Sequence, residues 1–444
     1  GPGGRQAGRV RRPERLTLQR CPLTRVARGR RSIERRPLRR PQMCMGRCTL
    51  GTPRSGRTYD DSSYSLNFGQ KSNCTGIFAG IGLARAGLEQ AGFSVAWAND
   101  YEAKKHQLYR SQYGSDTDYH VGDIADINGS HLPTDSAIAW ASSPCTDLSL
   151  AGNRDGLGGR QSGTFWHFMR ILEEMGDSRP PVAVLENVTG LASSHSGDDL
   201  TAAIRAFNSL GYSIDALSID ARHFIPQSRP RMFLVGALTP PDSDDTPSDL
   251  RPEWLEWIHS DPTLITHRAP LPAAPPLLTE GFTALADRLS IDDPHWWNPS
   301  RTADFLDSLS PVQAARLESL RTSTRVTYRT AYRRTRQGNP VWEIRPDDIA
   351  GCLRTARGGS SRQAVVKAGK GNVAVRWMTP HEYASLMGVP AYKFGDATDN
   401  QIRFGFGDAV AVPVVAWLGK NYLMPLVRQE FDQGSPSLEV VAHG

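Results

Sequence analysis

Two side chains of this sequence have types and positions suited to covalent chemistry on a nitrogenous base. Cys145 follows Ser143 and Pro144 just beyond an apolar run, and Glu186 comes directly after a second apolar run at residues 182–185. A thiolate is a strong nucleophile, but a free thiol is mostly protonated at neutral pH and needs activation. A carboxylic acid beside it could protonate a ring nitrogen. An isolated cysteine is more often inert and buried, so Cys145 gains meaning only from its neighbours.

Two arginines extend this group. They stand in the run Gln227-Ser228-Arg229-Pro230-Arg231, which leads into an apolar segment. In an extended chain Arg229 and Arg231 point to the same side. Two guanidinium groups can then face one site and hold a base oxygen and a phosphate.

A further set of residues is suited to a nucleoside-bearing cofactor. Phe78, Gly80 and Gly82 lie in a Phe-Ala-Gly-Ile-Gly run where a predicted strand turns into a helix. Glycines there let a ligand approach the backbone, and the helix N-terminus offers free N–H groups. Asp100, about 20 residues further on, is placed for a ribose hydroxyl pair, and Asp123 could accept from an adenine amine. Each feature alone is also typical of a steric turn or a cap. No phosphate-binding lysine follows the glycines, which disfavours an NTPase loop.

The elements that must position these residues alternate between strands and helices. This alternation predicts an α/β fold with a doubly wound, mainly parallel sheet. Such sheets bind ligands at the carboxyl ends of their strands, and each motif above falls at such an end. The predicted strands cover residues 75–79, 94–98, 137–140, 182–185, 212–219 and 232–235, and the predicted helices cover residues 83–91, 102–113, 164–175 and 200–210.

Outside this pattern the chain is less regular. Residues 239–300 are rich in Pro, Asp and Trp and predict loops. Further helices are predicted at residues 311–320, capped by Ser310, at residues 379–387, capped by Thr379, and at residues 410–418. The segment after the cysteine, residues 146–163, contains five glycines and is predicted to be a mobile lid.

Charge is distributed unevenly along the chain. Residues 1–50 hold 15 arginines against only Glu14 and Glu34. Residues 3–72 lack periodicity and predict a disordered arm, which is either a nucleic-acid-binding tail or a non-native upstream translation, and Gly1-Pro2 resembles a protease scar. Residues 321–370 carry 12 basic and 3 acidic side chains, which indicates phosphate contact, although a solvated face would look similar.

Some classes of protein are disfavoured by composition. The six cysteines show no paired Cys-x-x-Cys spacing, so neither a zinc site nor a disulfide framework is predicted. No apolar run suits a membrane helix, and the first 30 residues lack the apolar core of a secretory signal. These features predict a soluble, intracellular protein.

In order, the motifs resemble those of the DNA cytosine-5 methyltransferase family in its bacterial restriction-modification or phage-defence form. They are Phe-Ala-Gly-Ile-Gly, Pro-Cys, Glu-Asn-Val, Gln-Ser-Arg-Pro-Arg and Gly-Asp-Ala-Val, and the similarity runs from about Cys74 to Leu423. Any one is common, whereas all five in order are specific. The resemblance implies a Rossmann-like S-adenosylmethionine-dependent methyltransferase domain and a smaller, irregular target-recognition domain. It also implies methyl transfer to carbon 5 of a cytosine flipped out of duplex DNA.

The family's roles carry over to the matching positions. Cys145 would add to carbon 6 of cytosine, and Glu186 would protonate or hydrogen-bond ring nitrogen 3. Arg231, with Arg229, would hold the base oxygen. No metal is implied. The residues that would contact S-adenosylmethionine, released as S-adenosylhomocysteine, are Phe78, Gly80, Gly82, Asp100, Tyr101, Asp123, Ile124, Pro144, Asp408 and Val410.

The resemblance also implies a discontinuous catalytic domain. Residues 239–376 would form the target-recognition domain, inserted between residues 73–238 and 377–430, and residues 431–444 would be a flexible tail. The segment Arg376-Trp377-Met378-Thr379-Pro380-His381-Glu382 resembles the motif that closes the insert. Most DNA-contacting arginines hold phosphates and a minority read guanine edges. The predicted DNA contacts are Asn187, Arg325, Arg329, Arg333, Arg334, Arg336, Arg357 and Arg362.

The predicted partner is double-stranded DNA, and components of a restriction or defence system are candidate further partners. The enzyme is predicted to be a monomer in a bacterial cytoplasm, associated with the nucleoid. Two positions depart from the family pattern. Thr146-Asp147 replaces the frequent Gln and aromatic pair, which should alter how the lid meets DNA. Asp408 replaces the usual Asn, which should alter the affinity for the cofactor or the tolerance for another sulfonium donor.

Three other functions remain open at this point. The first is a transfer RNA cytosine-5 methyltransferase, although the large basic recognition segment favours DNA as the substrate. The second is a catalytically silent DNA-binding relative, although the presence of Cys145, Glu186 and Arg231 favours an active enzyme. The third is a Rossmann-type oxidoreductase, which would explain the glycine turn and none of the other motifs.

Overall fold

Two β-sheets are formed by the residues that the computed structural model describes, which are residues 72–114, 118–144, 163–355 and 362–428. All of these residues belong to one compact unit, Leu66–Gly444. The predicted arm up to residue 71, Cys145 with the loop as far as residue 162, Arg357 and the predicted tail lie outside the described residues.

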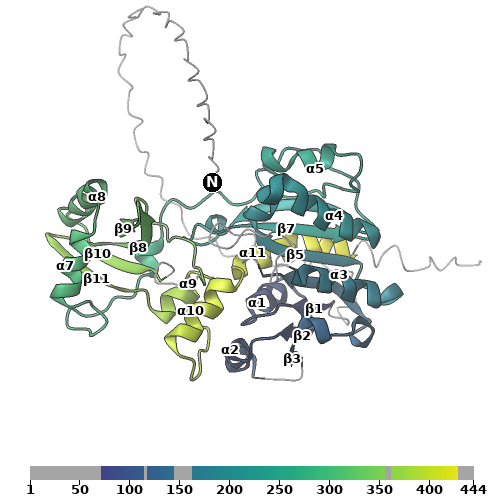
Figure 1. The fold of residues 1–444 in the computed structure, drawn as a ribbon, viewed down its shortest axis with the longest axis horizontal. Coiled ribbons are helices and arrows are strands. Elements are labelled where there is room, and N and C mark those ends of the chain that lie inside the picture. Colours follow the sequence, from purple (N-terminus) through teal and green to yellow (C-terminus); the bar gives the residue numbers. More distant parts are fainter. Residues whose placement is uncertain (1–71, 115–117, 145–162, 356–361, 429–444) are drawn as a thin grey trace, which may run out of the picture. The chain divides into compact units, whose positions relative to one another are not determined.

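The first sheet has seven strands in the order β3-β2-β1-β4-β5-β7-β6 (Figure 1). Paired strands are parallel except that β7 runs antiparallel to both β5 and β6. From β1 the chain builds outward to β3 and then crosses to β4 on the other side of β1, which makes the β1–β4 border a topological switch point. The strands are β1 (Asn73–Ile77), β2 (Ser94–Asp100), β3 (Tyr119–Val121), β4 (Ser136–Ser142), β5 (Val182–Val188), β6 (Ser213–Asp220) and β7 (Pro230–Ala237).

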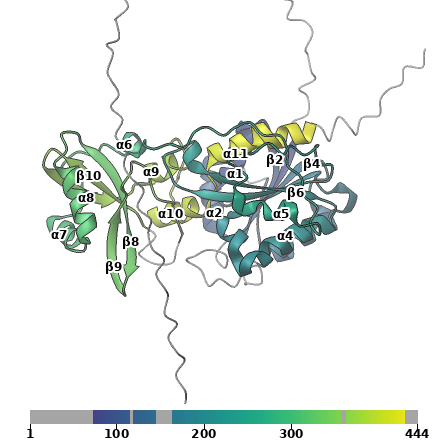
Figure 2. The same cartoon turned by 90° about the horizontal axis from the view of Figure 1, so that it is seen from above.

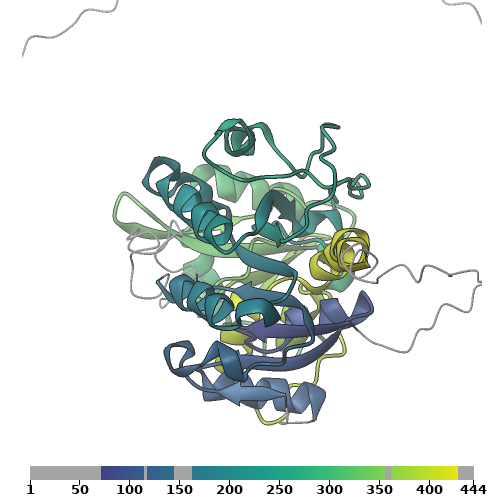
Figure 3. The ribbon, with the colours of Figure 1, turned by 90° about the vertical axis from the view of Figure 1, so that its right-hand side faces the viewer.

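Helices cover both faces of this sheet (Figure 3). On one face lie α1, α2, α10 and α11, with Leu88, Leu108 and Val415 in a shared core. On the other face lie α3 and α4, with Phe168 and Ile204 in a second core. The bounds are α1 (Leu83–Gln90), α2 (Ala103–Tyr113), α3 (Thr164–Glu174), α4 (Asp198–Ser209), α10 (Asp399–Asp408) and α11 (Val412–Leu418).

The predicted α/β fold with a mainly parallel sheet is confirmed, and each strand and helix predicted before residue 236 overlaps an observed one. Sequence patterns do not predict β3 or α10. β3 has only three residues, two of them exposed. α10 contains Gly405 and Gly407, which lower its helix propensity. Gly405 is required by packing, since a Cβ there would lie 2.6 Å from the side chain of Ile81 on the adjoining turn.

One apolar helical stretch, Asp399–Arg428, is long and apolar enough to cross a membrane by length and composition alone. It is interrupted by non-helical residues between α10 and α11. Its most apolar window is 61% buried inside the protein, and α11 packs against α1. These observations fit a core segment of the first sheet's helical layer.

The second sheet has four antiparallel strands in the order β11-β10-β8-β9. The region expected to be irregular therefore contains regular structure. Its many arginines interrupt the apolar pattern by which strands are predicted from sequence. Buried and half-buried residues alternate only over the first four positions of β8, and the half-buried positions of the strand include Arg329 and Arg333. The strands are β8 (Thr327–Arg336), β9 (Asn339–Ile344), β10 (Ala364–Gly369) and β11 (Asn372–Trp377), and the helices beside them are α7 (Pro299–Asp307) and α8 (Pro311–Arg321).

Short helices complete the chain. Residues 239–298 are mostly loop, as predicted, apart from α5 (Trp257–Ser260), α6 (Phe282–Leu285) and one turn of 3-10 helix. α9 (Pro380–Ser385) begins with a capping box between Thr379 and Glu382. Glu382 also forms a fully buried ion pair with Arg376, at 2.6 Å from Nη2 to Oε1. In both Figure 1 and Figure 2, α9 and α10 lie between the two sheets.

The turn before β7 joins the two sheets. Gln227 is fully buried, and its backbone forms a bridge with Ala350. Its side-chain oxygen accepts from the N–H of Leu353 at 3.0 Å, and its side-chain nitrogen donates to the carbonyl of Leu386 at 2.5 Å. One side chain therefore contacts the segment between β9 and β10 and the end of α9 together.

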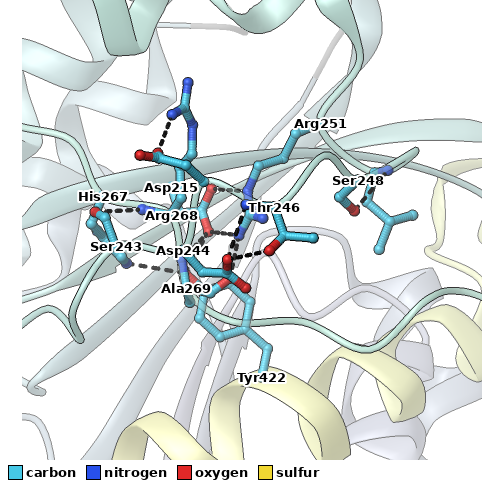
Figure 4. Close-up of polar contacts among 12 residues, drawn as sticks. Asp215, Ser243, Asp244, Thr246, Ser248, Arg251, His267, Arg268, Ala269 and Tyr422 are labelled. Carbon is cyan, nitrogen blue, oxygen red and sulfur yellow. Dashed lines mark hydrogen bonds and ion pairs between the residues drawn. The ribbon is translucent and has the colours of Figure 1, made fainter.

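A buried polar network fastens the segment after β7 to the edge strand β6 (Figure 4). Asp215 is completely buried and forms two hydrogen bonds with Arg251, at 3.0 and 2.6 Å. It also accepts from the N–H of Ala269 at 3.1 Å and from the hydroxyl of Tyr422 at 2.9 Å. His267 contacts the same hydroxyl at 3.0 Å. The carboxylate thus ties three separate parts of the chain together.

Candidate active site

The predicted catalytic and cofactor motifs meet at one edge of the seven-stranded sheet. The carboxyl ends of β1, β2, β4 and β5 share this edge, and the antiparallel β7 begins there. In the strand register, Ser142 of β4 lies beside Glu186 of β5, and Val188 lies beside Arg231 of β7. Glu186 and Arg231 are therefore diagonal neighbours on one face of an antiparallel pair.

Glu186 is a buried carboxyl group with an arginine beside it. The residue is 5% exposed, and its Oε1 lies 3.2 Å from Nε of Arg231. Burial raises the pKa of Glu186, and the charges of Arg231 and Arg229 with a hydrogen bond from Ser142 offset only part of this effect. The carboxyl group therefore retains its proton at a pH where an exposed glutamate is ionised. A neutral carboxyl can donate to a ring nitrogen, as the sequence predicts.

Arg229 lies in the interior, and most of its guanidinium contacts are with main-chain carbonyls. It is 1% exposed, and it donates to Leu353 at 2.7 Å, to Gly407 at 3.0 Å and to Ala409 at 2.5 Å. These contacts hold the segment between β9 and β10 to the end of α10. The predicted role of Arg229 in holding the base stays a prediction, and the geometry gives it a positioning role.

Both arginines reach Cys352, which sequence reasoning did not single out. Its Sγ lies 3.3 Å from Nη1 of Arg229 and 4.0 Å from Nη2 of Arg231, so the two guanidinium groups do lie on the same side. Burial raises the pKa of the Cys352 thiol, but Arg229, Arg231 and Arg354 outweigh burial, and the net pKa is lowered. Cys352 is far from the predicted motifs along the chain, so sequence patterns did not indicate it.

Asn187 anchors the residues that precede the predicted nucleophile. It is 3% exposed, and its Nδ2 donates to the hydroxyl of Ser143 at 2.9 Å. Its Oδ1 accepts from the N–H of Val188 at 2.8 Å. Pro144 is the last residue of this segment that the structure describes. The DNA contact expected of Asn187 stays a prediction, because its side chain faces Ser143.

The glycine turn leaves room beside the switch point. Phe78 and Gly80 have positive φ values of 57° and 56°. A Cβ on Gly80 would meet nothing within 4 Å, whereas one on Gly82 would lie 2.4 Å from the ring of Tyr113. The two glycines thus serve different ends: Gly80 borders open space where a ligand can approach the backbone, and Gly82 permits close packing of α1 on α2.

The predicted acids lie around this opening. Asp100 is 4% exposed, and its carboxylate accepts from the N–H of Gly80 at 3.1 Å and of Glu102 at 3.0 Å. Tyr101, next to it, is 62% exposed and available to flank a ring. Asp123 caps a 3-10 turn, with Oδ1 accepting from Ala125 N at 3.0 Å, so only its other oxygen is open to a ligand. Ile124 and Val410 are buried.

Asp408 is joined to the cofactor side by Lys105. The Nζ of Lys105 lies 3.0 Å from Asp408, 3.6 Å from Glu102 and 4.0 Å from Asp100. Burial lowers the pKa of Lys105, but Asp100, Asp408 and Glu102 outweigh burial and hold the pKa above its ordinary value. The hydroxyl of Thr355 donates to the same carboxylate. Lys105 was not predicted, although its spacing from Asp100 placed it on the first turn of α2.

Comparison with known proteins decides the family. The model of the C-5 cytosine-specific DNA methylase family matches residues 73–423. The chain belongs to this family. The predicted DNA cytosine-5 methyltransferase is thereby confirmed at the level of the family, and S-adenosylmethionine is confirmed as the family's methyl donor.

Individual members of the family are similar over different lengths. Type II methyltransferase M.Bsp6I of Bacillus sp. is 26% identical over 78% of this chain and 96% of its own. Type II methyltransferase M.BsuFI of Bacillus subtilis is 32% identical over 38% of this chain, and that match spans only 40% of the relative. A crystal structure of S. pombe Dnmt2 methyltransferase covers 80% of this chain and 99% of its own, with a TM-score of 0.54 at 14% identity, which supports the fold alone.

The residues of this DNA methylase that could hold the cofactor are consistent with its chemistry. An acid at the end of β2 beside an open glycine suits a ribose and its adjoining chain, and both are present as Asp100 and Gly80. In the part of the chain that the structure describes, no group of three or more His, Cys, Asp or Glu side chains could hold a metal ion.

The predicted DNA-contacting arginines fall into two groups. Arg329 and Arg336 form ion pairs with Asp348 and Glu343, at 2.7 and 2.5 Å, so their charges are already matched. Arg334 lies 4.0 Å from Glu343 and 4.8 Å from the centre of the Tyr332 ring. Arg325, Arg333 and Arg362 have no carboxylate within 4.0 Å among the described residues. Contact with DNA stays a prediction for all of them.

The Asp408–Lys105 pair leads to a first testable expectation. Asp408→Asn should weaken binding of S-adenosylmethionine about two- to fivefold, which corresponds to a partly exposed ion pair. Without Asp408, Lys105 is free to move toward Asp100 and compete with the ligand for that carboxylate. Titration calorimetry measures the affinity. Asp245→Asn, which removes an exposed aspartate paired with Arg268 and distant in sequence from the cofactor motifs, is the control and should bind normally. Unchanged or tighter binding by Asp408→Asn would contradict the expectation.

Proposed function

We propose that this DNA methylase transfers the methyl group of S-adenosylmethionine to carbon 5 of a cytosine in duplex DNA, with Cys145 as the covalent nucleophile. The observation that carries the proposal is the buried Glu186 carboxyl beside Arg231, with Ser143 held by Asn187 on the neighbouring strand. Ser143, which precedes Cys145 by two residues in the sequence, is held at the edge where Glu186 lies.

The chain's own residues would act in a fixed order. The Cys145 thiolate forms a bond to carbon 6, and Glu186 gives its proton to ring nitrogen 3, so that the added electrons reach carbon 5 as an enamine. Carbon 5 then forms the bond to the methyl group. A base, proposed to be water, takes the proton from carbon 5, the bond from sulfur to carbon 6 breaks, and Glu186 regains the proton from nitrogen 3.

The cofactor would supply an electrophilic methyl group on a cationic sulfur and leave as S-adenosylhomocysteine. Asp100 would hold the ribose, Tyr101 would flank the adenine and Asp123 would accept from its amine. Phe78, Gly80 and Gly82 would border the chain that joins ribose and sulfur. Arg231 would hold the base oxygen, which also keeps the carboxyl of Glu186 in place.

The remainder of the proposal concerns DNA and setting. A stacked cytosine is out of reach, so the base must leave the duplex, which costs a few kcal/mol. Residues 239–376 would recognise the target sequence, with residues 73–238 and 377–430 completing the catalytic domain. A monomer acting on chromosomal DNA in a bacterial cytoplasm, within a restriction or phage-defence system, is the proposed setting, because several curated relatives are type II or phage methyltransferases.

One experiment tests the reaction and the nucleophile together. The protein is incubated with S-adenosylmethionine and duplex DNA of mixed sequence, and the digested product is analysed for 5-methylcytosine by mass spectrometry. Cys145→Ser runs beside it, with Cys48→Ser as the control, since Cys48 belongs to the arginine-rich N-terminal sequence outside the predicted motifs. The expected result is a signal on DNA that only Cys145→Ser abolishes.

Transfer RNA serves as a parallel substrate. A signal on RNA and not on DNA would replace the proposal with the transfer RNA alternative. No signal on either nucleic acid, with S-adenosylmethionine binding demonstrated by calorimetry, would favour a silent DNA-binding relative and overturn the proposal. A signal that persists in Cys145→Ser would reject Cys145 as the nucleophile.

A further inference from the structure

A hollow of about 590 Å³ lies in the second sheet's region, away from Glu186 and the glycine turn. Its wall is built by α7, β8, β9, β11 and the first half of α10, with Arg362 beside them. Its size falls in the range of pockets that take small organic ligands. None of its lining residues belongs to the candidate active site.

Three tryptophans form one wall of this hollow. The three rings are mutual neighbours, with centroids 4.9 Å apart for Trp297 and Trp377, 5.7 Å for Trp297 and Trp342, and 5.8 Å for Trp342 and Trp377. Phe305 of α7 packs against Trp342 at 5.4 Å. Flat rings, and guanidinium groups that lie over them, offer surfaces on which another ring can stack.

Four arginines line the same hollow, and Asp304 is the one acidic side chain among its lining residues. Arg301 lies over the rings of Trp297 and Trp377, at 4.3 and 4.8 Å from their centres. Arg362 lies over Trp377 at 4.5 Å. Guanidinium planes stacked in this way keep their N–H groups free to point into the hollow.

These arginines form no close ion pairs. Among the described residues, no carboxylate lies within 4.0 Å of Arg301, Arg333, Arg362 or Arg403. Burial lowers the pKa of Arg362, the nearby cations Arg403 and Arg301 lower it further, and Tyr383 and Asp399 offset only part of this effect. Four other arginines of this region do have carboxylate partners: Arg329 with Asp348, Arg336 with Glu343, Arg345 with Asp347, and Arg376 with Glu382. The hollow therefore gathers unmatched positive charge against an aromatic wall.

We propose that this hollow binds a nucleotide, with the base stacked on the tryptophan wall and the phosphate held by the arginines. A flat ring joined to an anion is the ligand that matches both halves of the lining, since bases stack on aromatic side chains and arginines pair with phosphate. Two sources present this chemistry: a nucleotide unstacked from a DNA strand, and a free mononucleotide. In either case the site is separate from the one that receives the cytosine.

The hollow is linked to the cofactor side through α10. Arg403 and Asn400 lie on its first turns, with Nη2 of Arg403 donating to Asn400 at 2.6 Å. Asp408, at the end of the same helix, forms the ion pair with Lys105. The separation along the helix is about 7 Å. A nucleotide in the hollow would thus contact the helix that also carries Asp408, the partner of Lys105.

The test measures binding and needs no methyl transfer. Fluorescence anisotropy compares a short labelled duplex with the same duplex carrying one bulged adenine, which is not the target base of the active site. The variants are the double substitution Arg362→Gln with Arg403→Gln, and Arg321→Gln as a control. Arg321 lies on α8, outside the hollow, and is paired with Glu318. Thermal unfolding checks that all variants are folded.

We expect the protein to bind the bulged duplex about tenfold more tightly than the paired one. The double variant should lose this preference, and Arg321→Gln should keep it. In a second arm, calorimetry compares deoxyadenosine 5′-monophosphate with deoxyadenosine. Binding of the monophosphate that the double variant loses, without any preference for the bulge, would assign the hollow to free nucleotides. No binding in either arm, or binding that the double variant retains, would overturn the proposal.

Discussion

Glu186→Gln should lower the rate of methyl transfer by about 10²- to 10⁴-fold, the usual contribution of a positioned general acid. Gln has the same shape and can still contact Arg231, but it cannot give a proton to ring nitrogen 3. The measurement is a single-turnover assay with labelled S-adenosylmethionine. Glu318→Gln, which changes an exposed glutamate on α8, is the control and should react at the normal rate.

The raised pKa of Glu186 adds a dependence on pH with a definite sign. Above pH 4.5 the unfolded chain releases this proton and the folded chain keeps it, so this group makes the free energy of unfolding fall as pH rises to the raised pKa. Glu186→Gln should abolish that fall while it removes activity. A variant that is slow because it is misfolded would instead be less stable at every pH. An active Glu186→Gln would reject proton donation from this residue.

Arg251→Ala should destabilise the folded unit by about 3–5 kcal/mol, because it leaves the charge of Asp215 buried without its partner. Asp215 is 0% exposed, and Arg251 supplies two of its hydrogen bonds (Figure 4). Urea unfolding gives the free energy by linear extrapolation. Arg268→Ala is the matched control, since this neighbouring arginine pairs with the exposed Asp245 and Glu256 and should cost under about 1 kcal/mol.

A double variant separates a lost contact from a stranded charge. Adding Asp215→Asn to Arg251→Ala removes the buried charge, so part of the lost stability should return. Equal losses for Arg251→Ala and Arg268→Ala would show that the network contributes no more than a surface pair. A double variant less stable than Arg251→Ala alone would show that the carboxylate is stabilised by Tyr422 and Ala269 without the arginine.

The sequence was a good guide wherever local pattern and motif agreed. The strands that carry Glu186 and the glycine turn are apolar runs that end in a polar motif, so both their existence and their functional edge could be predicted. β8 shows why the second sheet could not be. Its arginines take half-buried positions, where their stems cover apolar surface and their charges meet Asp348 or stack on rings. The alternation of apolar and polar residues that predicts a strand is therefore missing from the sequence of β8.

Contacts between distant parts of the chain could not be predicted from the sequence either. Arg229 and Asn187 were expected to serve the substrate because the family motif contains them, yet the structure turns both toward the protein. Arg229 bonds to carbonyls more than 120 residues away, and Asn187 to a hydroxyl 44 residues away. Cys352 approaches the site only because the segment after β9 returns to it, and Lys105 meets Asp408 only because α10 returns to α2. Motifs indicate which residues matter, while the fold decides what each of them touches.

The turn Gln227–Arg229 has a consequence for how this enzyme can change its target. Gln227 and Arg229 bond largely to main-chain groups of segments that follow β9. These groups belong to Leu353, Leu386, Gly407 and Ala409. Main-chain groups are the same whatever side chains surround them. The joint is therefore insensitive to the side chains around it. Under the proposed function, residues between Ala269 and Ala350, which lie beyond the Asp215 network, can be exchanged by recombination to give a new DNA specificity, while the chemistry at the sheet edge is inherited intact.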